Sequence, residues 1–228
     1  MYRFIGFCLI PLLYSCNPFY NPQQRTIDLA NSLQERYPAL SESQQILVAT
    51  ADSAGAFTGQ LYGLEKRGNE WSILLDTIGV TFGASGVAPI GGKREGDKRT
   101  PGGAFALGPA FGYEPLPGLS IPYIDLDTSH YWVSASSSPQ YNQLVKGKPK
   151  ETNVEKMQRE DELYEFGIVI QYNTDPAVPD RGSAIFIHVG RGMNDPTLGC
   201  IAMDRAAILR LLQWLDTEMN PWIVVDSM

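Results

Sequence analysis

The spacing of apolar residues changes along the chain, and each change predicts a different element. In residues 26–37 the apolar positions recur every three or four residues, which is typical of one face of a helix. Thr26 is a candidate N-cap for this helix, and Pro38 is expected to end it. A second helix is predicted after Asp204, a suitable N-cap, and before Pro221. The apolar faces of the two helices comprise Ile27, Ala30, Leu33 and Tyr37, and Ile208, Leu211, Leu212 and Leu215.

Between these helices the apolar runs are short and are bounded by Gly, Asp or Asn, which indicates strands. Residues 83–118 are so rich in Gly and Pro that no long element is expected there. Residues 146–161 are polar and charged, and they predict either one exposed helix or a mobile flap. The sequence therefore predicts a single domain, mainly β with a few helices, over residues 44–228. The predicted strands cover 46–48, 58–64, 71–75, 166–172, 184–189 and 222–225.

Composition narrows the class of protein. With 43% hydrophobic residues among 228, the chain has enough apolar material for a core. Its 22 Gly and 16 Pro argue against a helical bundle. A net charge of −7 argues against a nucleic-acid partner, which requires clustered positive charge. No run reaches the roughly 20 apolar residues that a membrane-spanning helix needs.

The amino terminus has the layout of an export signal. Arg3 precedes a short apolar run over residues 4–13, and Ser15 then stands before Cys16. This ending resembles the bacterial lipobox, in which the cysteine is lipidated and becomes the new amino terminus. The alternative is a plain signal peptide with Cys16 as an incidental thiol. We expect a signal peptide over residues 1–15, a tether and helix over 16–43, and a protein exported to the cell envelope and held on a membrane by a lipid on Cys16.

Cysteine and histidine are scarce, which limits the chemistry. The three cysteines are Cys8, Cys16 and Cys200, and the two histidines are His130 and His188. They form no short-spaced pair of the kind that holds zinc, so neither a metal nor another cofactor is expected. An odd number of cysteines also excludes a complete set of internal disulfides.

One segment places a nucleophile near a base. His188 ends a buried-looking strand, and Cys200 follows twelve residues later, directly after Gly199. The intervening turn is long enough to bring the imidazole beside the thiol, where it can take the thiol proton and create a nucleophile. Gly199 allows a substrate close to the backbone, where N–H groups can stabilise an oxyanion. We expect the backbone carbonyl after His188 to orient the ring, with Asp195 a weaker candidate.

The same residues also have a purely structural interpretation. A lone cysteine is often a small buried hydrophobic group, and a histidine at the end of a strand is often satisfied by its neighbours. An activated nucleophile would show a lowered thiol pKa, whereas a structural cysteine would not. His130 is interpreted as a half-buried strand residue, because no nucleophile accompanies it.

Other polar residues are candidates for substrate binding. Arg94, in a basic cluster over residues 93–99, and Arg191 are suited to an anionic group, although solvated loops carry such charges too. Asn142 is a candidate for a hydrogen bond to a substrate amide, with a turn role as the alternative. Residues 86–93 are rich in Gly, but their spacing and the Arg that follows do not match a phosphate-binding loop, so no nucleotide is expected.

His188 and the Thr197-Leu-Gly-Cys200 run resemble the signature of the L,D-transpeptidase (YkuD) catalytic domain family. Residues 93–103 look like the Gly-Asp-x-x-Thr-Pro-x-Gly segment of these enzymes. Tyr141-Asn142, Tyr172-Asn173 and the 184–188 strand follow in the order of the family, so the resemblance covers about residues 72–225. Leu198 and Ala202 depart from the residues common at those places, which leaves substrate preference open.

The resemblance implies a β-sandwich-like catalytic domain that acts on peptidoglycan stem peptides. Cys200 would attack the carbonyl of the diamino acid at position three of the stem, and the terminal D-alanine would leave. A thioester would form on Cys200, and His188 would act as general acid and base. Thr197 would lie in the substrate site. An amine of a second stem would then resolve the thioester and form a cross-link. One alternative is transfer to water, as in a carboxypeptidase or an amidase, and another is transfer to a protein amine, as in a ligase that attaches a protein to the wall. A third is a wall-binding lipoprotein without catalysis.

Overall fold

The computed structural model describes residues 22–227. The predicted signal peptide and Cys16 lie outside these described residues. Within them the chain forms two α-helices, two short 3₁₀ helices and fourteen strands. The helices are α1 (Pro22–Arg36), η1 (Pro38–Leu40), α2 (Arg205–Trp214) and η2 (Thr217–Met219). The strands are β1 (Gln45–Ala51), β2 (Thr58–Arg67), β3 (Glu70–Thr81), β4 (Val87–Ala88), β5 (Thr100–Pro101), β6 (Gly103–Gly112), β7 (Tyr123–Asp125), β8 (His130–Val133), β9 (Leu144–Lys146), β10 (Val154–Lys156), β11 (Phe166–Ile170), β12 (Phe186–Val189), β13 (Ile201–Met203) and β14 (Trp222–Ser227).

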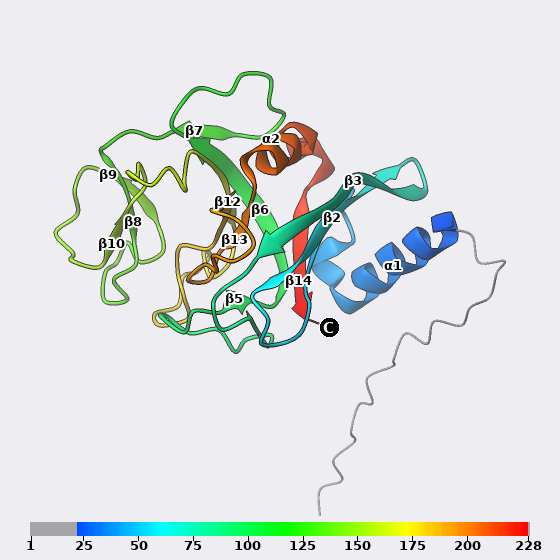
Figure 1. Ribbon diagram of the computed structural model, residues 1–228, viewed down its shortest axis with the longest axis horizontal. Helices are drawn as coiled ribbons and strands as arrows, with labels where there is room; N and C mark the ends of the chain where they lie inside the picture. The colour runs from blue at the N-terminus through cyan, green and yellow to red at the C-terminus, as the bar shows by residue number, and fades with distance from the viewer. Residues whose placement is uncertain (1–21, 228) are drawn as a thin grey trace, which may run out of the picture.

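Nine strands form one sheet that closes on itself. Their order is β11-β12-β13-β3-β2-β1-β14-β6-β7. Strand β6 also pairs with β11, which closes the sheet and leaves β7 beside β6 as an extra strand. Most pairs are antiparallel, and three are parallel: β12 with β13, β1 with β14, and β6 with β7. Figure 1 shows the long strands β2, β3, β6 and β14 crossing the middle of the molecule, with α1 outside them. The mainly β, single-domain prediction is confirmed.

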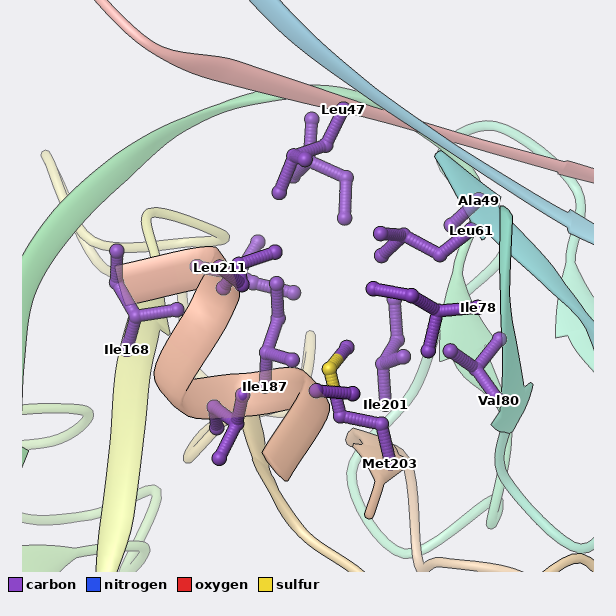
Figure 2. Packing of buried hydrophobic residues seen from close by; sticks show 14 of the residues in the cluster. Leu47, Ala49, Leu61, Ile78, Val80, Ile168, Ile187, Ile201, Met203 and Leu211 are labelled. Carbon is purple, nitrogen blue, oxygen red and sulfur yellow. The ribbon is translucent and has the colours of Figure 1, made fainter. Parts of the chain in front are cut away.

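The central core lies between this sheet and α2. Alternate residues of β1, Leu47 and Ala49, face it, while Ile46 and Val48 face the other side of the strand. Figure 2 shows Leu211 of α2 among side chains contributed by strands on both sides. A helix in this position is buried along one face, and this explains the apolar spacing that predicted it.

A second, smaller core lies under α1. Ala30 and Leu33 of the helix pack with Trp71 of β3 and with the outer face of β1. The strand β1 is therefore buried on both faces, which explains its continuous apolar run. The predicted helix is confirmed, but it begins at Pro22, so Thr26 lies inside the helix and the predicted cap is wrong.

The structure corrects three further predictions. Residues 146–161 contain no helix, because β10 pairs with β8 and a helix through Pro149 would lose a hydrogen bond. The breaker-rich stretch contains the ten-residue strand β6, in which Gly and Pro are tolerated where its pairing passes from β14 to β11. The second helix is capped by Asp204 as predicted, but it ends at Trp214, well before Pro221.

A three-stranded sheet, β10-β8-β9, lies beside the main one. His130 of β8 is buried in it, and its Nδ1 accepts from the N–H of Asp127 at 3.0 Å. This placement agrees with a strand residue. Across residues 22–227, no helix has both the length and the apolar character needed to cross a membrane.

Candidate active site

The register of β12 and β13 brings the predicted histidine and cysteine together. Ile187 pairs with Ile201, and His188 pairs with Ala202. Because side chains alternate between the faces of a strand, Cys200 points to the same side as Ala202 and His188. Ile187 and Ile201 point the other way, into the central core. The side chains of His188 and Cys200 therefore share one face of the β12–β13 pair.

A cleft of about 900 Å³ lies over this face, and both His188 and Cys200 line it. Its walls come from segments that are distant in sequence. These segments lie within residues 93–96, 153–164, 183–185, 190–191 and 195–199. The cleft is large enough for a peptide-sized substrate.

His188 is oriented by its own backbone neighbour. Its Nδ1 lies 2.8 Å from the carbonyl oxygen of Val189, and since a carbonyl can only accept, Nδ1 carries the proton and Nε2 is left as the base. This carbonyl is the predicted orienting group, whereas Asp195 pairs with Arg191. The ring also packs against Tyr164 in a T-shaped arrangement, with centroids 5.3 Å apart. Burial lowers the pKa of His188 from 6.5 to about 4, so the imidazole is neutral at pH 7.

Cys200 is held in its protonated form. Its Sγ donates to the carbonyl oxygen of Ala184 at 3.3 Å. Burial raises the pKa of the thiol from 9.0 to about 12, and the Glu155 carboxylate adds to the rise. A lowered pKa, the expected mark of an activated nucleophile, is therefore absent at rest. The resting pair consists of a neutral thiol and a neutral imidazole, so a thiolate forms only when the proton passes to His188.

Thr197 shapes the turn that carries the cysteine. Its Oγ1 donates to the carbonyl oxygen of Cys200 at 2.7 Å and accepts from the N–H of Gly199 at 3.1 Å. Thr100 Oγ1 donates to the same carbonyl at 3.1 Å. Gly199 has a φ of +149°, and a Cβ there would lie 3.1 Å from the carbonyl oxygen of Arg99. Gly is therefore needed for the backbone conformation and for close packing. The hydroxyl of Thr197 serves the turn, so Thr197 is a positioning residue.

A network of charged side chains forms one wall of the cleft. Tyr164 Oη donates to Glu155 Oε1 at 2.6 Å, and Arg159 Nη1 donates to the same atom at 3.0 Å. Arg159 also holds Asp161 through two hydrogen bonds, at 2.8 and 2.6 Å. Arg191 reaches Asp161 at 2.7 Å. Burial raises the pKa of Glu155 and also that of Tyr164. Of this wall, the sequence singled out only Arg191.

In the structure Lys93, and not the predicted Arg94, is the basic residue that lines the cleft. Arg94 is exposed, and its guanidinium donates to the backbone carbonyls of Gly91 and Lys93. Arg94 does not line the cleft, whereas Lys93 does. The Lys93 side chain is 4% exposed and pairs with Asp97. Its Nζ would lie 3.5 Å from a Cβ placed on Gly199, so this cation stands beside the turn that carries Cys200.

The predicted hydrogen bond from Asn142 to a substrate amide has no free group to make it. Asn142 is buried, and its side-chain amide is occupied by four protein groups. Asn142 also has a φ of +59°, which agrees with the alternative role in a turn.

Sequence reasoning missed several residues of the cleft. Glu155 and Arg159 lie in the polar segment interpreted as a helix or flap, and no periodicity there indicated that their side chains face a site. Tyr164 and Ala184 carry no pattern of their own, because only the fold brings them to Cys200 and His188. No three side chains of His, Cys, Asp or Glu within residues 22–227 gather as a metal would require.

Comparisons with known proteins place this site in a family. The L,D-transpeptidase catalytic domain (YkuD) model matches residues 58–225, and no curated protein matches the chain. Among solved structures, the chain is similar to Bd1075 of Bdellovibrio bacteriovorus, with 12% identity and a TM-score of 0.41 over 80% of this chain and 47% of that one. It is also similar to the helical cell shape determining protein Pgp2 of Campylobacter jejuni, with 14% identity and a TM-score of 0.40 over 87% of this chain and 55% of that one.

The chain spans about half the length of these two solved proteins. The family model covers well over half of the 228 residues, and its match includes both His188 and Cys200. The chain therefore belongs to the L,D-transpeptidase (YkuD) catalytic domain family.

Proposed function

We propose that this protein is an exported peptidoglycan L,D-transpeptidase that uses Cys200 as its nucleophile and His188 as its general acid and base. The observation that carries the proposal is the shared face of β12 and β13. There a buried thiol and a neutral imidazole line a single cleft of about 900 Å³. Membership in the L,D-transpeptidase family supplies the substrate class, a stem peptide of peptidoglycan.

The first half-reaction begins with a neutral pair. As the stem peptide binds, Nε2 of His188 takes the proton of the Cys200 thiol, and Sγ forms a bond to the carbonyl carbon of the diamino acid. The bond from that carbon to the terminal D-alanine nitrogen then breaks. The protonated His188 gives its proton to the leaving amine, which leaves a thioester on Cys200.

The second half-reaction returns the enzyme to its starting state. An amine from another stem attacks the thioester carbon, and His188 takes a proton from this amine. The new C–N bond forms, the C–S bond breaks, and the sulfur recovers its proton from His188. The orientation of His188 by the Val189 carbonyl supports this shuttle, because Nε2 stays available in both directions.

The test uses a carbapenem as an acylating probe, with the intact mass as the readout. The protein is the full chain with Cys8 and Cys16 replaced by serine, so that Cys200 is its one thiol. One stable adduct is expected. Cys200→Ala should show none, and His188→Ala should acylate at least about a hundredfold more slowly, in line with the loss of a general base. A missing adduct on the folded protein would favour the wall-binding lipoprotein.

The acceptor is tested with a tetrapeptide stem. Release of D-alanine together with a dimer of stems indicates transfer to an amine. Release together with a free tripeptide indicates transfer to water, which is the carboxypeptidase alternative. A protein amine that captures the acyl group would instead appear as stem-modified protein.

We propose further that export depends on the amino terminus and that a lipid on Cys16 holds the protein at a membrane of the cell envelope. The pattern over residues 1–16 supports this proposal. The mass of the amino-terminal peptide in cells should include a diacylglycerol on Cys16, and Cys16→Ala should release the protein from the membrane fraction. An unmodified terminus at another position would support a plain signal peptide.

A further inference from the structure

Three consecutive residues before β12 are each held by a different side chain. Of these residues, 182–184, the last two line the cleft, and Ala184 accepts a hydrogen bond from the nucleophile. The contacts are the Gly182 N–H to Tyr141 Oη at 3.1 Å, Ser183 Oγ to Glu95 Oε2 at 2.8 Å, and the Ala184 N–H to Asn142 Oδ1 at 3.0 Å. Tyr141 Oη also donates to Glu95 Oε2 at 2.6 Å, which links the contacts into one unit. We call this unit the 182–184 clamp.

Asn142 is built into the protein on every side. Its Oδ1 accepts from Trp132 Nε1 at 2.9 Å as well as from Ala184, and its Nδ2 donates to the carbonyls of Tyr172 and Asn173 at 3.0 and 2.7 Å. A side-chain amide has two donors and two acceptor positions, so all four are in use. Such an amide has one orientation, and it fixes the N–H that it receives.

The residue that the clamp fixes is strained, and it touches the nucleophile. Ala184 has a φ of +53°, a left-handed conformation that is unfavourable for a non-glycine residue. In this conformation its carbonyl oxygen accepts the proton of Cys200 Sγ at 3.3 Å. The clamp thus stabilises an unfavourable backbone conformation at the position where the resting thiol is held.

We propose that Tyr141 and Asn142 are positioning residues, which keep Ala184 in its left-handed conformation so that its carbonyl holds the Cys200 thiol in place beside His188. The hydrogen bond from Cys200 to the Ala184 carbonyl is a property of the resting protein, and it does not depend on which reaction the protein catalyses. Its effect on catalysis rests on the proposed function, since a sulfur displaced by about 1 Å acylates up to about a hundredfold more slowly.

The test measures the S–H stretching band of the single thiol by infrared spectroscopy, using the full chain with Cys8 and Cys16 replaced by serine. In this parent the band lies at the lower frequency of a hydrogen-bonded thiol. In Asn142→Ala, Ala184 relaxes, its carbonyl turns away, and the band moves to the frequency of a free thiol. Ala184→Gly added to Asn142→Ala removes the strain that drives this relaxation and should return the band part of the way, which the loss of mere packing would not allow.

Asn220→Ala is the matched control. Asn220 also has a positive φ, +48°, and its Oδ1 accepts from Trp222 Nε1 at 3.3 Å, but it does not line the cleft. Its band should stay where the parent's lies.

If Asn142→Ala fails to fold, Tyr141→Phe keeps the ring and removes only the hydroxyl. A hydrogen-bonded band in either folded clamp variant overturns the proposal. Slower acylation by the carbapenem, by about tenfold to a hundredfold, is the catalytic counterpart. If no form of the protein acylates, the proposed function fails while the band still decides the clamp.

Discussion

At the scale of single residues, the site consists of two groups that burial keeps neutral. Burial lowers the pKa of His188 to about 4 and raises that of Cys200 to about 12. Moving a proton from sulfur to nitrogen creates two charges where little water reaches, and this is unfavourable until a substrate supplies compensating groups. The thiol is therefore protected at rest, and under the proposed function its reactivity depends on the bound stem peptide.

This neutrality predicts slow reaction with small electrophiles. Iodoacetamide should alkylate folded Cys200 at pH 7 much more slowly than it alkylates free cysteine, because the thiolate fraction at a pKa of about 12 is negligible. The rate is followed by intact mass in the full chain with Cys8 and Cys16 replaced by serine. The same protein unfolded in denaturant serves as the control and should react at the ordinary rate. Rapid alkylation of the folded protein at pH 6 to 7 would show that the resting pair is already ionised.

Slow alkylation consequently does not distinguish an enzyme from a binding protein here. A lowered thiol pKa and fast alkylation mark a cysteine that is a thiolate at rest, and Cys200 is not of this kind. Acylation by a substrate-like probe separates the two classes instead, because in the proposed mechanism only bound ligand draws the proton toward His188.

At the scale of elements, the sequence predicted best where one physical signal governs the structure. Both helices were predicted because their apolar faces pack on the cores. His188 and Cys200 were paired because the turn between them is long enough to bring the two side chains together. The family resemblance rested on the same segment, and the family is confirmed over residues 58–225. The spacing of apolar residues, together with this one motif, therefore predicts the fold class and the family.

The elements that were missed depend on contacts between distant segments. Strand β10 is polar, and it is a strand because β8 offers it an edge, with Glu155 opposite Trp132. The β10 segment then turns back toward the cleft and brings Arg159 to Glu155. Local residue preferences do not indicate a pairing between distant segments, so the sequence did not predict the charged wall of the cleft. Asn142 shows the reverse case, since its residue type was noticed and only the fold revealed its partners.

At the scale of the whole molecule, the site and the central core share a backbone. Ile187 and Ile201 fill the core between the closed sheet and α2, while His188 and Cys200 project from the opposite face of the same two strands. The site therefore cannot shift without moving the core. Because the same packing buries His188 in its neutral form, protonation of this histidine at low pH favours the unfolded chain.

This linkage predicts how stability depends on pH. Because the pKa of His188 falls from 6.5 when unfolded to about 4 when folded, the unfolded chain binds more protons between these values. The contribution of His188 to the free energy of unfolding is thus fully present above pH 6.5 and is lost as pH falls toward 4. The expected loss from this histidine is about 3 kcal/mol. Urea denaturation at pH 7 and pH 4 measures the loss. In His188→Gln, whose side chain does not titrate, the decline between the two pH values should be smaller by about that amount. Equal declines in the two proteins would mean that His188 becomes protonated in the folded state near its ordinary pKa, and the neutral pair proposed for the resting site would then be wrong.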